Sequence, residues 1–128
     1  MVAFKYFHGK SNVNIAQSLS VGGAFTRASA LRDASIQLET PASGDTVLIS
    51  DETDMLILNP AGVLATLTIT LPSENIDNGQ TVTIASDMEI TAVTLNGGTI
   101  NGAITTLAAN GFAQYIYELS TDTWYRIG

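Results

Sequence analysis

Four Asn-Gly pairs punctuate the C-terminal half of this chain and separate short apolar runs. Asparagine and glycine are the residues that best tolerate the positive φ angles of tight turns. Such a pair between two apolar runs marks a place where a β-strand can end and the chain reverse. The pairs are Asn78-Gly79, Asn96-Gly97, Asn101-Gly102 and Asn110-Gly111. The runs between the last three pairs are too short for helices, so the chain is predicted to be built from short strands.

Between these turns apolar and polar residues alternate with the period of two that is typical of half-buried strands. In residues 64–72, "LATLTITLP", Leu67, Ile69 and Leu71 alternate with threonines, so one face enters a core and the other presents hydroxyls. Residues 80–85, "QTVTIA", repeat the pattern with Val82 and Ile84 directed inward.

Two further stretches carry the strand pattern with a complication. In residues 90–95, "ITAVTL", Val93 and Leu95 share a face but Ile90 is out of phase, which predicts a bulge or a strand start near Thr91. The apolar runs 46–50 and 55–59 flank an acidic turn, "DETD", and are predicted to pair as a hairpin. In residues 113–119 the alternation places Ala113, Tyr115, Tyr117 and Leu119 on one face.

The N-terminal part of the chain has a different residue pattern. Residues 1–23 show no clear period, residues 24–38 contain good helix formers that predict one short helix, and "TPASGD" at 40–45 marks a loop. About eight strands at roughly 8 to 12 residue spacing favour an antiparallel arrangement. The predicted fold is therefore all-β: a single antiparallel β-sandwich or jelly-roll-like domain over residues 41–128, preceded by an extended N-terminal arm over residues 1–40.

Charge divides the chain at nearly the same place. Residues 1–32 hold four cations and no acid, whereas residues 33–128 hold Arg126 against twelve acids, a net charge of −11. The arm either lies on its own acidic body or binds a partner. Four dispersed cations are too sparse to follow a phosphate backbone, so we expect no nucleic-acid partner. The candidate partner-binding residues are the rings and cations of the arm: Phe4, Lys5, Tyr6, Phe7, Lys10, Phe25, Arg27 and Arg32.

Composition excludes several classes of protein. Hydrophobic residues make up 45% of the chain and charged ones 13%, which argues against disorder and predicts an unusually uncharged surface. There is no cysteine, so neither disulfides nor thiolate metal sites are available. The first ten residues lack the apolar stretch of a signal peptide, and no run approaches membrane-spanning length, so we expect neither secretion nor membrane insertion.

The sequence shows no recognisable set of catalytic residues. The single histidine, His8, stands in the poorly patterned arm, so we expect no hydrolase triad, no enzyme and no cofactor. The acids Asp45, Asp51, Glu52 and Asp54 are candidates for a Ca²⁺ site, but they lack the spacing of a known loop, and a solvated turn is favoured.

The aromatic residues near the C-terminus allow two interpretations. Trp124 and Tyr125 are candidate surface-binding residues that, with Tyr115 and Tyr117, would form a platform for sugar rings. Large rings in small β domains usually fill the core or a subunit interface, and we favour that alternative. The strand pattern also predicts that Trp124 and Tyr125 lie on opposite faces.

Residues 58–128, 71 of the 128, carry a resemblance to a known family. In order they contain "LNPAGVLATLTITLPS", "DNGQTVTIAS", "ITAVTLNGGTINGAITTLAANGFAQYIYE" and "TWYRIG". This succession resembles a β-rich module of virion structural proteins of tailed bacteriophages, found in capsid decoration proteins and at the ends of tail fibres. The resemblance implies a non-enzymatic virion component, commonly a homotrimer, that binds other virion proteins or a host surface.

Two features favour the head of the virion over the tail. The chain has no heptads and no room for a fibre shaft, and an extended arm suits attachment to a capsid-protein sheet or groove. The expected function is a decoration or cement protein that binds the major capsid protein on the capsid exterior after assembly in the host cytoplasm. The alternative is a tail-associated receptor-binding domain that holds host surface glycans.

Overall fold

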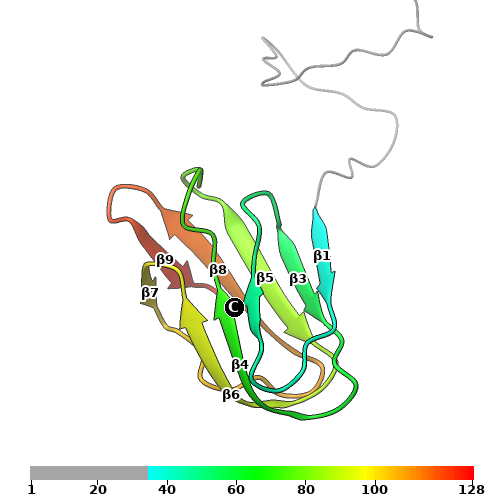
Figure 1. Ribbon diagram of the computed structural model, residues 1–128. Coiled ribbons are helices and arrows are strands. Elements are labelled where there is room, and N and C mark those ends of the chain that lie inside the picture. The colour runs from blue at the N-terminus through cyan, green and yellow to red at the C-terminus, as the bar shows by residue number, and fades with distance from the viewer. Residues whose placement is uncertain (1–34) are drawn as a thin grey trace, which may run out of the picture. The chain divides into compact units, whose positions relative to one another are not determined.

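The computed structural model describes residues 35–128, and over this range the fold is all-β without a helix. The strands form a large sheet of six, in the order β1-β3-β5-β8-β9-β7, and a small sheet of three, in the order β2-β4-β6 (Figure 1). Their bounds are β1 (Ile36–Glu39), β2 (Thr46–Leu48), β3 (Met55–Leu58), β4 (Leu64–Thr70), β5 (Thr81–Ser86), β6 (Ile90–Asn96), β7 (Thr99–Asn101), β8 (Gly111–Glu118) and β9 (Thr123–Arg126).

The first six strands alternate between the two sheets. β1, β3 and β5 lie side by side in the large sheet and β2, β4 and β6 in the small one, and all four of these pairings are parallel. The chain therefore winds three times, and each pass leaves one strand in each sheet. This is the stacking of a short β-solenoid, in which each pass packs on its neighbour. β8, β9 and β7 then extend the large sheet beyond β5.

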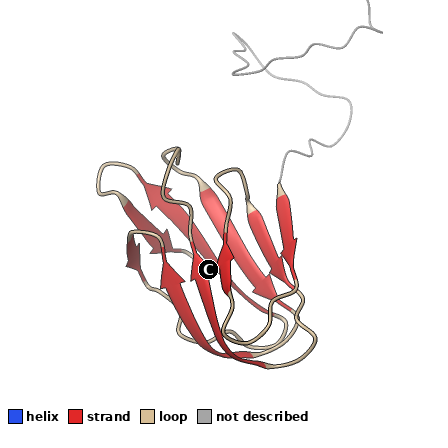
Figure 2. Ribbon diagram, viewed as in Figure 1, coloured by secondary structure: helices blue, strands red, loops and turns tan. Residues whose placement is uncertain are grey.

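The predicted antiparallel sandwich or jelly roll is thus wrong in its topology, although the all-β class is confirmed for the described residues. Among the seven strand pairings in the described part of the chain, only β5 with β8 and β8 with β9 are antiparallel. The predicted hairpin of residues 46–50 and 55–59 is also wrong, because β2 and β3 lie in different sheets. The "DETD" turn carries the chain across the gap between the layers and does not reverse it beside itself (Figure 2).

The N-terminal predictions fall partly outside the described residues. Residues 1–34 are not described, so most of the expected helix over 24–38 is not tested, but its last residues, Ile36–Leu38, belong to strand β1. Long-range pairing with β3 overrides the helix propensity of this stretch, since Ile36 aligns with Met55 and Leu38 with Ile57. The first strand therefore lies upstream of the loop at Pro41.

The Asn-Gly pairs do mark strand ends, but not hairpins. Gly79, Gly97 and Gly102 have positive φ, and in the fourth pair Asn110 has it instead. Each pair lies where the chain passes from one sheet to the other. The first two pairs lie between a strand of the small sheet and the next strand of the large sheet. The segment between the last two pairs returns to the small sheet, where Leu107 bridges β6. Within residues 35–128 the only turn between consecutive antiparallel neighbours joins β8 to β9.

Gly97 is the turn residue with the least room. Its φ is 115°, and an added Cβ would lie 2.6 Å from the carbonyl oxygen of Leu71. We expect Gly97→Ala to lower the free energy of unfolding by about 2–4 kcal/mol, because backbone strain and a clash with main-chain atoms add. Urea unfolding followed by tryptophan fluorescence measures the change.

Gly98 is the matched control for Gly97. It also has a positive φ, 88°, but no atom lies within 4 Å of its built Cβ. Gly98→Ala should therefore lower the free energy of unfolding by only about 1–2 kcal/mol, the cost of placing alanine in a left-handed conformation. Equal losses for the two variants would show that the contact with Leu71 is not what restricts Gly97.

The alternating pattern correctly predicted most of the side chains that enter the core; Leu119, expected on one face with Ala113, Tyr115 and Tyr117, instead lies beyond the end of β8 and is 56% exposed. Leu67, Ile69 and Leu71 are buried, as are Val82 and Ile84. The core lies between the sheets and takes buried apolar side chains from β2, β3, β4, β5, β6, β8 and β9 and from the loops. Leu95 of β6 and Ile100 of β7 are partly buried and pack against it.

The phase break at Ile90 has a simple origin. Strand β6 starts at Ile90, so of the two alternatives the strand start is confirmed and the bulge is not found. The register that pairs Leu64 with Ile90 still holds where Thr70 pairs with Asn96, which leaves no extra residue in either strand. β4 shows the same burial sequence at its own start, with a buried residue, two exposed ones and a second buried residue.

The sheets differ in width, and large aromatic side chains fill the difference. Three strands cannot cover six, so the inner face of β8 and β9 has loops opposite it where a fourth small-sheet strand would lie. Tyr115, Tyr117 and Trp124 project from this face and are at most 6% exposed. Rings bury more area per residue than aliphatic side chains, which suits positions where the opposing layer is a loop.

Candidate functional site

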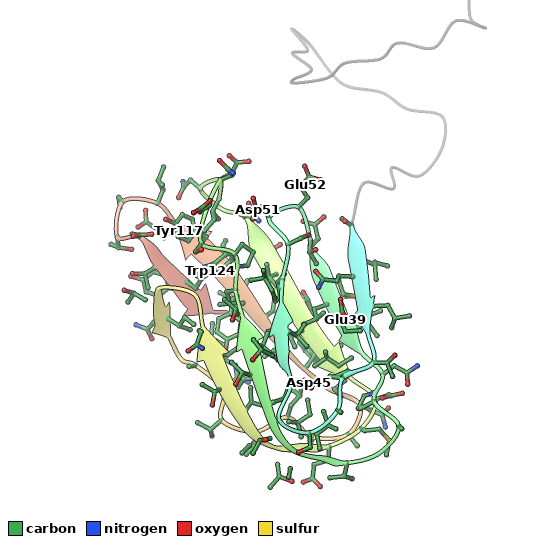
Figure 3. All side chains as sticks on the ribbon, in the orientation of Figure 1. Glu39, Asp45, Asp51, Glu52, Tyr117 and Trp124 are labelled. Atoms are coloured by element: carbon green, nitrogen blue, oxygen red, sulfur yellow. The ribbon has the colours of Figure 1, made fainter. Side chains whose placement is uncertain are left out.

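Trp124 belongs to the core and not to a surface platform. It is 1% exposed, and its ring centroid lies 5.3 Å from that of Tyr117 with the planes tilted by 56° (Figure 3). Its indole Nε1 donates a hydrogen bond to the carbonyl oxygen of Pro72, 3.2 Å away. A ring held in this way offers no face to a sugar, so the surface-binding role considered for Trp124 is corrected to a structural one. Tyr125 lies on the opposite, outer face and is half-buried.

Tyr115 holds in place the loop that lies opposite β8, where the small sheet has no fourth strand. Its hydroxyl donates to the carbonyl oxygen of Gly102 at 3.0 Å and accepts from the backbone nitrogen of Ile104 at 3.1 Å. Burial raises the pKa of Tyr115, although the hydrogen bond from Ile104 opposes that effect. The neutral phenol is therefore the form that fits, and it acts as a tether rather than as an acid or base.

In the turn between β8 and β9 the carboxylate of Glu118 accepts several hydrogen bonds. Glu118 Oε2 accepts from the hydroxyl and the backbone nitrogen of Thr121, both at 2.8 Å, and Glu118 Oε1 accepts from the hydroxyl of Ser120 at 2.8 Å. These hydrogen bonds, those from Thr121 first, lower the pKa of Glu118 to about 2. On the other side of the turn the hydroxyl of Tyr117 donates to Asp122, which raises the pKa of Tyr117.

Glu118 gives the turn a defined dependence on pH. Because its folded pKa of about 2 lies below the ordinary value of 4.5, its contribution to stability is present above pH 4.5 and is lost as the pH falls through 2. We expect NMR titration of the full chain to place Glu118 near the lower value. Thr121→Val should move it back toward 4.5, and a wild-type Glu118 that titrates normally would contradict the assignment.

Of the acidic residues considered for Ca²⁺, Asp45 lies in the 40–45 loop, apart from Asp51, Glu52 and Asp54 in the 51–54 turn. Asp45 Oδ2 accepts from the backbone nitrogen of Ala42 at 2.8 Å, and Asp54 Oδ2 accepts from that of Ser35 at 2.9 Å. Figure 3 places Asp45 at the opposite end of the strands from Asp51 and Glu52. Within residues 35–128 no group of three acidic or histidine side chains gathers closely enough to hold a metal ion. The solvated-turn interpretation fits this geometry.

Two open hollows lie beside the acidic turn. One, of about 670 Å³, is lined by the 51–54 turn and residues 75–80; the other, of about 510 Å³, is lined by residues 48–52 and 72–74. Hydrogen bonds cross between their walls, since Gln80 Nε2 donates to the carbonyl oxygen of Asp51 at 2.9 Å. These hollows are gaps between hydrogen-bonded loops.

The first pass of the solenoid leaves two strand edges without a neighbouring strand among the described residues. β1 ends the large sheet and β2 ends the small one. The β2 edge is closed by Gln37, whose Nε2 donates to the carbonyl oxygen of Leu48 at 2.8 Å. Its Oε1 accepts from the backbone nitrogen of Ser50 at 3.1 Å and from Thr53 Oγ1 at 2.9 Å.

The edge of β1 is different. Ile36 and Leu38 are each 61% exposed, and no described strand or side chain pairs with the backbone on their outer side. A parallel edge strand of this kind can accept an added strand from another chain. The predicted partner-binding residues, Phe4 to Arg32, all precede this strand in the sequence and lie outside the described residues.

Sequence reasoning did not find Gln37 or the β1 edge. Both follow from which strands become neighbours across 20 or so residues of intervening chain, and alternation within a strand carries no such information. The only available signal was the apolar pair Ile36 and Leu38 in the stretch assigned to a helix.

No known protein family and no curated protein sequence matches this chain. Over residues 35–128 the structure holds no helix with the length and hydropathy that a bilayer crossing requires.

Proposed function

We propose that this chain is a non-enzymatic structural protein of a tailed-bacteriophage virion, and that it decorates the outer surface of the capsid. It binds the major capsid protein or another virion protein through its N-terminal region, as a homotrimer assembled in the host cytoplasm. Residues 35–128 form the body that this attachment displays. The motif succession over residues 58–128 is the basis for the phage assignment.

One structural observation carries the binding part of the proposal: the exposed edge of β1. Proteins usually protect such an edge with charge, proline or a covering segment, because it invites pairing with other chains. Here it bears two exposed aliphatic side chains, Ile36 and Leu38, and it begins four residues after residues 1–32, which hold four cations and no acid. An edge that continues into an apolar, basic segment is suited to adding a strand to a partner's sheet.

The mechanism is adhesion selective for the assembled shell. A ligand that binds only the assembled state stabilises that state by mass action. Contacts of about 800 Å² per partner are enough for a specific, lasting attachment. The acidic body, with one cation and eleven acids in residues 35–128, then faces outward and keeps decorated particles apart.

The alternative function, a glycan-binding tail domain, loses its main support. It required an exposed aromatic platform, and Trp124 is 1% exposed within the core. Tyr125, half-buried between Asn101 and Ile116 on the neighbouring strands, is left as a single ring without Trp124 beside it.

A reconstitution experiment tests the proposal. Phage particles assembled without this protein are mixed with the purified full chain, and bound protein is quantified after sedimentation. We expect saturable binding to heads, and an increase in the temperature at which heads release DNA. Binding to isolated tails or to bacterial cells, with none to heads, would contradict the proposal.

A further inference from the structure

The four Asn-Gly pairs share one dipeptide, but the fold holds them differently. Because glycine has no Cβ, its backbone nitrogen can approach the side-chain amide of a preceding asparagine without hindrance. That nitrogen can attack the asparagine Cγ and close a five-membered imide. The reaction requires a glycine N–H that water can reach and a main chain that can move, so hydrogen bonds and burial at the pair slow it.

The fold holds both reacting groups of the Asn78-Gly79 pair. Asn78 Oδ1 accepts a hydrogen bond from the backbone nitrogen of Leu119 at 2.9 Å. The backbone nitrogen of Gly79 donates to the carbonyl oxygen of Tyr117 at 2.8 Å. Closing the imide at this pair would break both hydrogen bonds, so the end of β8 protects Asn78.

The Asn110-Gly111 pair is held at the attacking nitrogen. The backbone nitrogen of Gly111 donates to the carbonyl oxygen of Ala108 at 2.9 Å. Gly111 is also half-buried and is the first residue of β8. The nitrogen that would attack Asn110 is therefore already engaged.

The Asn96-Gly97 pair is held through its main chain. The carbonyl oxygen of Asn96 accepts from the backbone nitrogen of Leu71 at 2.8 Å. Gly97 is half-buried, and a Cβ built on it would lie 2.6 Å from the carbonyl oxygen of Leu71. Asn96 also ends a strand of seven residues that pairs with β4 as far as Asn96 itself. Movement of this pair is therefore restricted by the main chain beside it.

The Asn101-Gly102 pair has none of these protections within residues 35–128. Both residues are exposed. Over that range no hydrogen bond engages the backbone nitrogen of Gly102 or the side-chain amide of Asn101. The hydroxyl of Tyr115 does hold Gly102, but through its carbonyl oxygen, which belongs to the next peptide unit. The attacking nitrogen is therefore open to water.

The strand that carries Asn101 is also the one with the least support. β7 is three residues long, and Asn101 is its last residue. Among the described strands it ends the large sheet and pairs with β9 alone. Short segments at the edge of a structure open locally at a low cost in free energy. The main chain at Asn101 can therefore move toward the geometry of the imide more readily than the main chain at Asn96.

We propose that Asn101-Gly102 is a site at which this chain modifies itself by deamidation. The backbone nitrogen of Gly102 loses its proton to water and bonds to Cγ of Asn101. The bond from Cγ to Nδ2 breaks, and Nδ2 takes up a proton and leaves as ammonia. Water then adds to one of the two imide carbonyls and opens the ring, which leaves aspartate or isoaspartate at position 101. Water is the only co-reactant, and the inference does not rest on the proposed function.

The isoaspartate product changes the structure as well as the charge. Both products add one negative charge, but isoaspartate also adds a methylene group to the main chain between β7 and Gly102. The hydroxyl of Tyr115 holds the carbonyl oxygen of Gly102 at 3.0 Å and the backbone nitrogen of Ile104 at 3.1 Å. A longer main chain must therefore shift this loop or separate Asn101 from its register partner Tyr125. The isoaspartate form should unfold at a lower urea concentration than the unmodified chain.

Peptide mapping by mass spectrometry of the folded full chain, incubated in mildly alkaline buffer, tests the inference. Cleavage after glutamate places Asn78 in residues 75–89 and the other three pairs in residues 90–118, where fragmentation separates them. Asn101 should convert at least about tenfold faster than Asn78, which must first break two hydrogen bonds. It should convert at least about threefold faster than Asn96 and Asn110.

The same incubation in urea is the control for the role of the fold. The four pairs are the same dipeptide, so their rates should converge once the chain is unfolded. Asn101→Gln should stop conversion at position 101 and leave the other three pairs unchanged, because the longer side chain closes a six-membered ring less readily. Asn101→Asp adds the charge without the methylene group, so it should keep the wild-type urea midpoint.

Two results would overturn the proposal. One is a folded chain in which Asn78, Asn96 or Asn110 converts as fast as Asn101. The other is a folded chain in which Asn101 stays intact while the unfolded chain converts. Neither result bears on attachment to capsids, which the reconstitution experiment measures separately.

Discussion

Replacing Trp124 by alanine is expected to lower the free energy of unfolding by about 3–5 kcal/mol. The side chain is 1% exposed, packs on Tyr117 and donates to the carbonyl oxygen of Pro72. Removing it leaves a cavity where a loop, not a strand, opposes the sheet, and leaves that carbonyl without its donor. Urea denaturation followed by circular dichroism gives the change without depending on tryptophan fluorescence.

Tyr125 is the natural control, because it is the next residue and lies on the opposite face of the same strand. It is half-buried, and its hydroxyl makes only a 3.3 Å contact with Thr121 Oγ1. Tyr125→Ala should therefore change stability much less than Trp124→Ala. If instead Trp124→Ala keeps full stability and abolishes binding on a glycan array, the core assignment is wrong and the receptor-binding alternative returns.

Deleting residues 1–32 is expected to leave a folded β domain that no longer binds capsids. Within residues 35–128 the core cluster consists of residues between Val47 and Trp124, all of which the truncated protein keeps. It does remove the rings of Phe4, Tyr6 and Phe7 and all cations except Arg126. Apolar burial at about 25 cal/mol per Å² must outweigh the backbone entropy lost on ordering an extended segment, and these rings are its main source in residues 1–32.

The deletion is checked by circular dichroism, urea unfolding and the capsid sedimentation assay on the same preparation. Binding of the full chain should weaken only modestly when the Debye length falls below about 10 Å, because four dispersed cations contribute less than the rings. Near-full occupancy by the truncated protein would contradict the account. So would failure of the truncated protein to fold, which would place those residues in the core of the body.

The sequence predicted the inward-facing residues well because burial follows a local rule. Leu67, Ile69 and Leu71 alternate with threonine, and any sheet that buries one of them buries all three. The same reasoning placed Trp124 and Tyr125 on opposite faces. These inferences need no knowledge of the neighbouring strand.

Topology could not be predicted in the same way. The acidic turn between β2 and β3 has the composition of a hairpin loop, yet it spans the two layers, because β3 gains a full parallel register with both β1 and β5 in the large sheet. At this turn the chain can either reverse into a hairpin or cross to the other sheet. Contacts between residues 19 to 28 positions apart decide which occurs, as in the alignment of Ile36 with Met55 and of Met55 with Thr83. Alternation is identical in both outcomes.

The β1 edge and Gln37 were missed for the same reason. Gln37 looks like a solvent-facing residue of a helix or strand until β2 and the 50–53 turn are placed beside it. Sequence alone identified the contrast between the basic arm and the acidic body, which is a property of composition.

The most direct test of the central claim is cryo-electron microscopy of the purified virion whose genome encodes this chain. The account predicts density for the two-sheet body of residues 35–128 on the outside of the head, with β1 and the N-terminal residues toward the capsid protein and the acidic turns toward solvent. Density for this domain at the tail tip, or its absence from every part of the particle, would contradict it.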